Sequence, residues 1–187
     1  MKKIVEIAHD LLVEYVPNCH ISVDFTMGRG NDTLFLAQHS SYVYAFDIQQ
    51  ECIEETKQKL NMHHLHNVKL ICASHADAFT YIKEKIDAGI FNFGYLPQSD
   101  QHITTMLETS KVAVQEALKR LVKKGMLILV LYPGHEEGEK ESEYFAKWSK
   151  QLASKDYNVM QIKMWNKEKA PYILAIQKIR EEEKNED

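Results

Sequence analysis

The sequence predicts an α/β fold in which helices flank a mostly parallel sheet. Apolar segments of strand length alternate with segments of helical spacing along most of the 187 residues. The most apolar segment, residues 126–132, is typical of a central strand that is covered on both faces. No helical pattern separates the last two of the seven expected strands, so we expect them to form a hairpin in which one strand is antiparallel.

The first half of the chain supports three pairs of strand and helix behind an opening helix. Residues 4–15 place apolar side chains at helical spacing, and this amphipathic helix ends before Pro17. Short apolar segments bounded by turn residues or acids indicate strands at residues 20–25, 42–47 and 68–73. The helices that follow these strands are expected at residues 31–38, 49–60 and 76–85.

The second half continues the alternation and then ends in strands. Gly89 is interpreted as introducing the fourth strand, residues 90–96. A long helix is expected over residues 106–123, and Gly125 is interpreted as its end, before the fifth strand. The remaining elements are a helix at residues 137–152 and strands at residues 157–165 and 172–178.

Composition and charge bound the kind of protein. We expect one domain over residues 1–180, followed by an acidic, frayed tail at residues 181–187. The formal charge is −4, but without the last seven residues, which hold five acids and one lysine, 22 acidic and 22 basic residues remain. Composition therefore neither demands nor excludes a nucleic-acid partner. No apolar run approaches the roughly 20 residues of a membrane helix, so we expect no membrane association.

The cysteines and the N-terminus indicate a cellular compartment. Cys19, Cys52 and Cys72 are odd in number and form no CxxC pair, which favours a reducing environment. Glu6 and Asp10 interrupt the apolar stretch that a signal peptide requires. We therefore expect a cytoplasmic protein whose cysteines are small core residues.

Two glycines interrupt the chain directly after the first strand, in the segment DFTMGRGNDT at residues 24–33. Gly28 and Gly30 let the backbone approach a ligand where a Cβ atom would clash. The second strand ends at Asp47, 17 residues after Gly30, where a carboxylate can accept both hydroxyls of a ribose. Because ligands of open α/β sheets bind beyond the carboxyl ends of the strands, the pattern predicts a nucleoside-containing cofactor.

The cofactor is NAD or S-adenosylmethionine. The dinucleotide fingerprint places a third glycine where this chain has Thr33, and an acid at a helix N-terminus repels pyrophosphate. Asp24, Asn31 and Asp32 suit the ammonium and carboxylate of S-adenosylmethionine, which we therefore favour. In the alternative interpretation, Asp32 only caps the helix and Asp24 is a turn residue.

Other strand ends add candidate side chains. Ser74 and His75 follow the third strand, where an adenine edge would lie, although a satisfied histidine at a strand end is an equal alternative. Asn92 lies inside an apolar strand, and a buried amide is costly unless it is hydrogen-bonded. His135 follows the fifth strand and either serves the reaction or caps a helix. The expected cofactor residues are Asp24, Gly28, Gly30, Asn31, Asp32, Asp47, Gln49, Ser74, His75 and Asn92.

Four segments carry a family resemblance that covers nearly the whole chain: DFTMGRGNDTLFLA, YAFDIQ, FNFGYLP and VLYPGHEEGE. In this order they resemble the small bacterial class I methyltransferases of the rRNA methylase family, and among them the tRNA 5-aminomethyl-2-thiouridine methyltransferases. The resemblance implies a Rossmann-like seven-stranded sheet of order 3-2-1-4-5-7-6 and S-adenosylmethionine as the cofactor. It also implies methylation of the aminomethyl nitrogen at the wobble uridine of a tRNA anticodon stem-loop. Gln98 and Ser99 depart from the small glycines that the family usually has there.

A second resemblance concerns the reaction. Residues 92–97 resemble the Asn-Pro-Pro-aromatic segment of amino-group methyltransferases, which implies that Asn92 orients the attacking amine and that Tyr95 packs on the substrate base. Alternatively, Asn92 only ties adjacent loops together. Asp100, Tyr95 or His135 accepts the proton, and the sequence does not choose among them. We expect direct in-line attack, with no metal and no covalent enzyme intermediate.

An RNA substrate needs cationic and aromatic contacts. Arg29, between the two glycines, and Lys2 and Lys3 are candidate phosphate contacts, and Tyr95 is a candidate for stacking on an unstacked base. A basic cluster at Lys119, Arg120, Lys123 and Lys124 is a further candidate, but a solvated helix face is the favoured interpretation of it. A homodimer is one assembly that the sequence allows. A ribosomal RNA methyltransferase, a small-molecule N-methyltransferase and a nucleotide-sensing module without activity are the alternatives.

Overall fold

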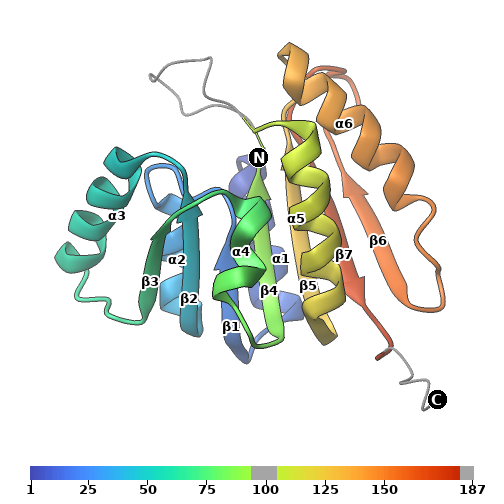
Figure 1. Cartoon of the computed structure of the whole chain (residues 1–187). Coiled ribbons are helices and arrows are strands. Elements are labelled where there is room, and N and C mark those ends of the chain that lie inside the picture. Colours follow the sequence, from blue (N-terminus) through green and yellow to red (C-terminus); the bar gives the residue numbers. More distant parts are fainter. Residues whose placement is uncertain (94–104, 182–187) are drawn as a thin grey trace.

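The computed structural model describes residues 1–93 and 105–181 (Figure 1). Two of the expected site residues, Tyr95 and Asp100, lie outside these ranges. Within them, a seven-stranded sheet has the order β3-β2-β1-β4-β5-β7-β6, which confirms the expected order. Strands β1 to β5 pair in parallel, and β7 is antiparallel to both β5 and β6, as the expected hairpin requires. The strands are β1 (Cys19–Asp24), β2 (Ser40–Asp47), β3 (Val68–Cys72), β4 (Ile86–Asn92), β5 (Leu121–Leu131), β6 (Tyr157–Ile162) and β7 (Tyr172–Lys178).

Helices cover both faces of the sheet (Figure 1). The helical elements are α1 (Ile4–Tyr15), α2 (Asn31–His39), α3 (Gln50–Met62), the 3-10 turn η1 (His75–Asp77), α4 (Ala78–Tyr81), α5 (Leu107–Arg120) and α6 (Glu136–Ser149). Buried residues of α1, α2 and α3 pack on one face, and those of α4, α5 and α6 pack on the other. Since each central strand is covered twice, β5 is apolar along most of its length.

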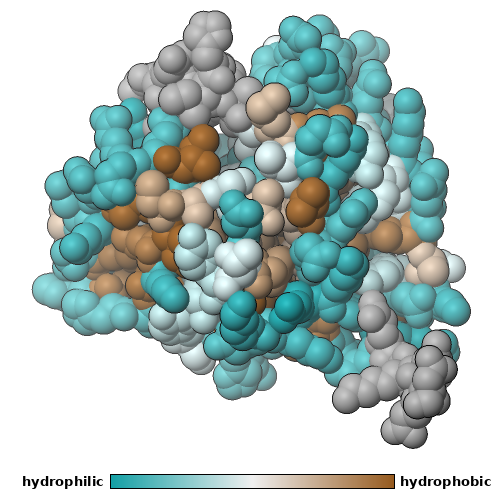
Figure 2. Space-filling model, viewed as in Figure 1, coloured by the Kyte–Doolittle hydropathy of each residue, from teal (hydrophilic) through white to brown (hydrophobic). Residues whose placement is uncertain are grey.

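A row of stacked phenylalanines forms the core on the α4 to α6 face. The ring centroids of Phe25 and Phe91 are 4.2 Å apart, those of Phe91 and Phe93 are 5.2 Å apart, and those of Phe93 and Phe145 are 5.3 Å apart. These four rings link the end of β1 and the end of β4 to α6. Viewed from this side, the surface is mostly hydrophilic over α5 and α6, whereas hydrophobic residues gather over β2 and β3, between α3 and α4 (Figure 2).

The expected helix at residues 76–85 is wrong. The chain forms the 3-10 turn η1, which Ser74 caps by accepting a hydrogen bond from the Ala76 backbone N–H, and then only one turn of α-helix, α4. Ile82, which is fully buried, already has an extended backbone. The next strand then begins at Ile86, four residues before the expected start at residue 90.

Gly89 and Gly125 do not mark boundaries. Both lie inside strands, and the long helix α5 ends at Arg120, directly before β5. A Cβ atom on Gly89 would lie 2.7 Å from Leu127 Cδ1, and one on Gly125 would lie 2.7 Å from the Asp87 carbonyl oxygen. These glycines therefore serve close packing, which local sequence patterns do not distinguish from a turn.

The expectation that the cysteines are small core residues is correct for two of the three. Cys19 and Cys52 are buried, but Cys72 is exposed because it ends β3, the edge strand of the sheet. Most other element bounds lie within three residues of the expected ones, although β5 begins five residues earlier. Among the described residues, no helix has both the length and the apolar character needed to cross a membrane.

Candidate active site

A cavity of about 1000 Å³ lies at the carboxyl ends of the parallel strands. Its wall contains the residues that follow β1, β2, β3, β4 and β5, which is where ligands of open α/β sheets bind. Ten of the expected site residues line it: Gly28, Arg29, Asn31, Asp32, Asp47, Gln49, Ser74, His75, Asn92 and His135. A smaller groove of about 550 Å³, under α1 and α2, contains none of the expected residues.

Four expected residues do not line the cavity. Asp24 is fully buried beneath it, and Gly30 packs against Thr56 of α3. Lys2 donates a hydrogen bond to Asp10 at 2.6 Å, and Lys3 uses its backbone N–H to bind Glu6. Val5 does line the cavity, so the beginning of α1 reaches its rim.

The turn between β1 and α2 has a specific backbone shape. Gly28 and Gly30 have φ angles of 49° and 73°, which L-residues with a Cβ atom rarely adopt. The Gly30 N–H donates to the Met27 carbonyl at 2.8 Å, and Gly30 is the N-cap of α2. A tight turn therefore presents Gly28 at the cavity wall.

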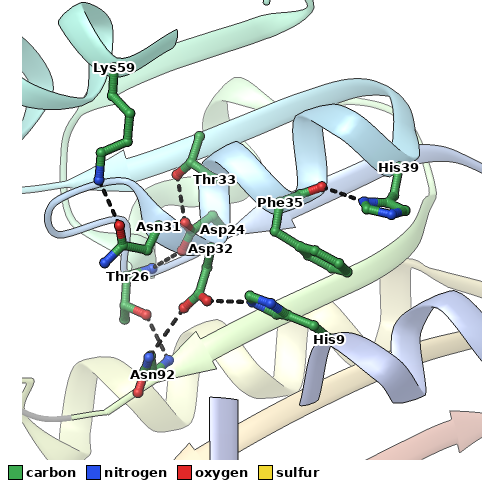
Figure 3. A network of polar contacts seen from close by, with 10 residues as sticks. All are labelled: His9, Asp24, Thr26, Asn31, Asp32, Thr33, Phe35, His39, Lys59 and Asn92. Atoms are coloured by element: carbon green, nitrogen blue, oxygen red, sulfur yellow. Dashed lines mark hydrogen bonds and ion pairs between the residues drawn. The ribbon is translucent and has the colours of Figure 1, made fainter. Parts of the chain in front are cut away.

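Helix α3 supports this turn from outside. Lys59 Nζ donates to Asn31 Oδ1 at 2.6 Å (Figure 3). It also donates to the Arg29 carbonyl at 2.7 Å. Arg29 Nε lies 3.8 Å from Glu55 Oε2, which is an exposed ion pair. The side chain of Arg29 is thus at the cavity and engaged with an acid of α3.

The Asp47 carboxylate accepts two backbone hydrogen bonds at the end of β2. The Gly28 N–H donates to Oδ2 and the Gln49 N–H donates to Oδ1, each at 2.9 Å. Each carboxylate oxygen has further acceptor capacity, and Asp47 lines the cavity. Asp47 therefore both holds the glycine turn and presents an acceptor to a ligand.

Asp32 connects three parts of the chain (Figure 3). Its Oδ1 lies 2.7 Å from Nε2 of His9 in α1, and its Oδ2 accepts a hydrogen bond from Asn92 Nδ2 at 3.1 Å. The Asn92 backbone N–H donates to Thr26 Oγ1 at 2.7 Å. Since Gly30 is the N-cap of α2 and Asp32 makes no cap hydrogen bond, the interpretation of Asp32 as a helix cap is wrong.

A second carboxylate lies behind Asp32. Asp24 accepts hydrogen bonds from Thr33 Oγ1 at 2.6 Å and from the Thr26 N–H at 3.2 Å. Burial, and then the negative charge of Asp32, raise the pKa of Asp24 well above the usual range of an aspartic acid. This shift favours a neutral Asp24, which supports the turn without adding a second negative charge beside the cavity.

His75 is a neutral side chain at the cavity wall. Burial lowers its pKa to about 4, although a hydrogen bond with the Phe25 backbone acts in the opposite direction. Its Nε2 atom is buried and has no hydrogen-bond partner among the described residues. A buried polar atom of this kind is expected to find its partner in a ligand.

The segment after β5 contributes Tyr132 and His135. Burial, and then the negative charge of Asp32, raise the pKa of Tyr132, and a hydrogen bond with the Asn92 side chain opposes this shift. His135 Nδ1 accepts a hydrogen bond from the Gly138 N–H at 3.1 Å, so His135 caps α6. With Nδ1 as the acceptor, a neutral His135 carries its proton on Nε2.

Several residues of the cavity region were not predicted from the sequence, and three of them illustrate the reasons. His9 lies on the amphipathic opening helix, and nothing in that pattern distinguishes it from a packing residue. Tyr132 directly follows β5 and lines the cavity, so its position after a strand could have indicated a site residue. Lys169 lies in the β6 to β7 connection, whose position depends on the hairpin.

The described residues contain no cluster of three His, Cys, Asp or Glu side chains that could hold a metal ion. The polar groups of the cavity are instead the carboxylates of Asp32 and Asp47, the amide of Asn92 and the imidazole of His75. This set can bind a cation and a ribose and can orient a neutral donor such as an amine.

Comparisons with known proteins agree with this geometry. The family described as "Putative rRNA methylase" matches residues 43–178. A curated relative from Arabidopsis thaliana, "tRNA (mnm(5)s(2)U34)-methyltransferase, chloroplastic", is 31% identical over 92% of this chain and 68% of its own length.

Solved structures give the same result. A protein from Streptococcus mutans, described as a putative methyltransferase in complex with SAH, is 34% identical with a TM-score of 0.88, over 96% of this chain and 99% of that chain. A protein from Clostridium thermocellum, described as a putative rRNA-methylase, has the same identity and coverage and a TM-score of 0.91. A structure described as an rRNA methylase from Streptococcus thermophilus is 30% identical, with a TM-score of 0.82 and the same coverage.

Proposed function

Because the chain belongs to the Putative rRNA methylase family, we propose that it methylates the aminomethyl nitrogen of 5-aminomethyl-2-thiouridine at the wobble position of tRNA. The protein is a methyltransferase that depends on S-adenosylmethionine. The tRNA substrate is supported by the relative from Arabidopsis thaliana, whose name gives this nucleoside. The proposal rests on one observation: the Asn92 amide lies at the wall of the cavity and donates a hydrogen bond to Asp32.

The residues around the cavity fit the cofactor. The Asp47 carboxylate lines the cavity with acceptor capacity left for ribose hydroxyls, which supports the proposed ribose contact. His75 Nε2, buried without a partner among the described residues, suits a polar atom of the adenine. Asp32 supplies negative charge for the cationic groups. When bound, S-adenosylmethionine supplies the methyl group on a sulfonium sulfur, from which an amine can take it directly.

Asn92 is proposed to orient the amine. Its Nδ2 donates to Asp32, so its Oδ1 is the end of the amide that accepts a hydrogen bond from an N–H group. A primary alkylamine has a pKa of roughly 10.4, and its neutral form costs about 4 to 5 kcal/mol near pH 7. Partial burial of the wall around Asn92 and Tyr132, together with the positive charge of a bound sulfonium, would favour the neutral form and would oppose the Asp32 carboxylate, which favours the ammonium. An amine held in this form by Asn92 Oδ1 would keep its lone pair available for attack on a methyl group.

The proton released on methylation requires an acceptor. His135 is disfavoured in this role, because Nδ1 already accepts the Gly138 N–H and Nε2 then carries the proton. Tyr95 and Asp100 lie outside the described residues and stay predictions, as does stacking of Tyr95 on the base. Arg29 at the rim, with Lys2 and Lys3 near the start of α1, is proposed to contact phosphates.

The proposal is tested by incubating the protein with S-adenosylmethionine and tRNA that lacks the final methyl group. Nucleoside mass spectrometry should detect 5-methylaminomethyl-2-thiouridine in place of 5-aminomethyl-2-thiouridine. The same tRNA carrying unmodified uridine at the wobble position is the control and should gain no methyl group. If neither tRNA gains a methyl group while the cofactor binds, the proposed substrate is wrong.

The family description favours ribosomal RNA as the second candidate substrate. Ribosomal RNA from cells without the enzyme is therefore included in the same assay. A methyl group on ribosomal RNA but not on tRNA would replace the proposal by this second function. Methylation of free amines only would instead indicate a small-molecule N-methyltransferase.

A further inference from the structure

The connection between β6 and β7 contributes to the cavity wall and carries an exposed tryptophan. Leu131 at the end of β5 pairs with Tyr172 at the start of β7, and Ile162 at the end of β6 pairs with Ile173. The connection, residues 163–171, therefore lies at the end of the sheet where the parallel strands have their carboxyl ends, as the cavity does (Figure 1). Lys169 and Pro171 line the cavity wall.

Trp165 has an unusual degree of exposure. Its exposed fraction is 90%, the highest among the large hydrophobic side chains of the described residues after Met1 at the chain end. The other tryptophan, Trp148, packs against Phe145 in the core. A large aromatic ring that contributes no burial to the fold is typical of a binding surface.

The connection around Trp165 has its own hydrogen bonds. The Lys167 N–H donates to the Met164 carbonyl at 3.4 Å, and the Ala170 N–H donates to the Lys167 carbonyl at 3.2 Å. Met164, Ala170 and Pro171 are half-buried, whereas Trp165 and the lysines are exposed. The connection is thus anchored at both ends and directs its aromatic and cationic side chains outward.

The charge of this segment is positive. Lys163, Lys167 and Lys169 outnumber the single acid Glu168, and none of the three lysines forms an ion pair within residues 1–93 and 105–181. Lys163 Nζ lies 5.6 Å from the centroid of the Trp165 ring. By contrast, Lys111, Lys119 and Lys140 lie on helices and each forms an ion pair with an acid of the same helix.

We propose that Trp165, with Lys163, Lys167 and Lys169, forms a surface that binds single-stranded RNA next to the cavity, so that a base of the anticodon loop stacks on Trp165. The inference rests on the proposed tRNA function and names a contact surface for that substrate. Proteins that bind unpaired RNA combine aromatic rings for stacking with lysines or arginines for phosphates, which is the combination in this segment. Lys169 joins the surface to the cavity, so one RNA loop can occupy both.

A second copy of the chain is a less suitable partner. In a twofold interface the same patch faces itself, so the three lysines of one copy would meet the three lysines of the other. The repulsion would not be offset by Glu168 alone. The phosphates of RNA complement this charge directly.

The test measures RNA binding by fluorescence anisotropy with a labelled anticodon stem-loop RNA and the full chain. Trp165→Ala should weaken binding about tenfold or more, and Trp165→Phe should retain most of it because a ring for stacking remains. Met62→Ala is the matched control, since Met62 is 79% exposed and ends α3, outside the cavity wall. Affinity for S-adenosylmethionine should be unchanged in all three variants, which verifies folding.

The lysines are tested by salt dependence. The combined variant Lys163→Gln, Lys167→Gln and Lys169→Gln should reduce the slope of log affinity against log salt by about 2. Lys123→Gln should leave the slope unchanged, because Lys123 lies near the beginning of β5, at the end of the sheet opposite the cavity. Unchanged RNA affinity in Trp165→Ala together with an unchanged slope in the lysine variant would overturn the proposal.

Two further readouts separate this inference from the proposed function. If the wild-type protein methylates the tRNA nucleoside and Trp165→Ala does so with the same KM for tRNA, the surface is wrong and the function stands. If RNA binds through Trp165 but no methyl group reaches tRNA, the proposed substrate is wrong and the surface stands. If Trp165→Ala instead converts a dimer to a monomer in sedimentation and leaves RNA affinity unchanged, the patch is an interface between copies and the proposal is overturned.

Discussion

Nε2 of His9 lies 2.7 Å from Oδ1 of Asp32, so the first helix of the chain reaches the carboxylate that holds the Asn92 amide. The His9 ring also stacks on Phe35 of α2, with centroids 3.8 Å apart and planes 2° apart (Figure 3). The stacking fixes the ring, and the ring in turn fixes one oxygen of Asp32. We therefore predict that His9 positions Asn92 through Asp32.

We expect His9→Phe to lower kcat about tenfold, because the ring still stacks on Phe35 but no longer hydrogen-bonds Asp32. His9→Gln should recover part of the loss, since its amide can donate to the same oxygen. The matched control is His39→Phe, because His39 also stacks on Phe35 but hydrogen-bonds only the Phe35 carbonyl. Steady-state methyl transfer measures these rates, and equal losses in His9→Phe and His39→Phe would contradict the positioning role.

Asn92→Ala should lower turnover by about 100-fold or more, because it removes the group that we propose to orient the amine. Affinity for S-adenosylmethionine, measured by calorimetry, should fall much less. Asn158→Ala, an exposed asparagine of β6, is the control and should change neither quantity. Equal losses of turnover and cofactor affinity would show that Asn92 serves cofactor binding instead.

Asp47→Ala should abolish measurable binding of S-adenosylmethionine, since the carboxylate both presents acceptors and holds the Gly28 N–H. Asp87→Ala is a matched control. Its carboxylate also accepts two backbone hydrogen bonds, from His20 and Ile21, but at the beginning of β1, away from the cavity. Unchanged cofactor affinity in Asp47→Ala would refute the placement of the ribose at Asp47.

Glu141 of α6 predicts a pH dependence of stability. It is fully buried and accepts hydrogen bonds from Ser110 Oγ at 2.6 Å and Thr105 Oγ1 at 2.8 Å. Burial raises the pKa of Glu141 to about 7, although these hydrogen bonds lower it. The folded protein therefore binds more protons than the unfolded chain between the unfolded pKa of about 4.5 and a pH near 7.

The free energy of unfolding is then expected to fall as the pH rises through this interval. Glu141→Gln cannot ionise, so it should gain stability relative to the wild type between pH 5 and pH 8, by up to roughly 3 kcal/mol. Urea denaturation at both pH values measures the difference. Glu143→Gln, an exposed neighbour on α6, should show no such gain. A pH-independent difference for Glu141→Gln would contradict the raised pKa.

Gly30→Ala should lower the free energy of unfolding by about 2 kcal/mol or more. The φ angle of Gly30 is +73°, and an added Cβ atom would lie 2.5 Å from Thr56 Oγ1. Gly134→Ala is the control, because an added Cβ atom there meets no atom within 4 Å. Denaturation of both variants in urea provides the measurement, and equal stabilities would show that the turn tolerates a side chain.

The parts of the site that the sequence predicted are those encoded by neighbouring residues. Gly28, Gly30 and Asp47 were predicted because a glycine turn after one strand and an acid at the end of the next are local patterns. The structure brings Gly28 and Asp47 into one hydrogen bond at 2.9 Å, while Asp24 and Gly30 remain behind the cavity wall. Whether a residue of this turn lines the cavity or lies behind its wall depends on how the turn packs against α3. No local sequence pattern contains this information.

The sequence by itself determined the order of the strands and helices and the position of the glycine turn. It did so because hydropathy periodicity and backbone conformational preferences act over a few residues. Only the tertiary structure decided that Gly89 and Gly125 serve close packing, that His9 reaches Asp32, and that the connection carrying Trp165 reaches the cavity wall through Lys169 and Pro171. These relationships join residues that are far apart in the chain, and they depend on strand register and helix packing, which form only when the whole core is assembled.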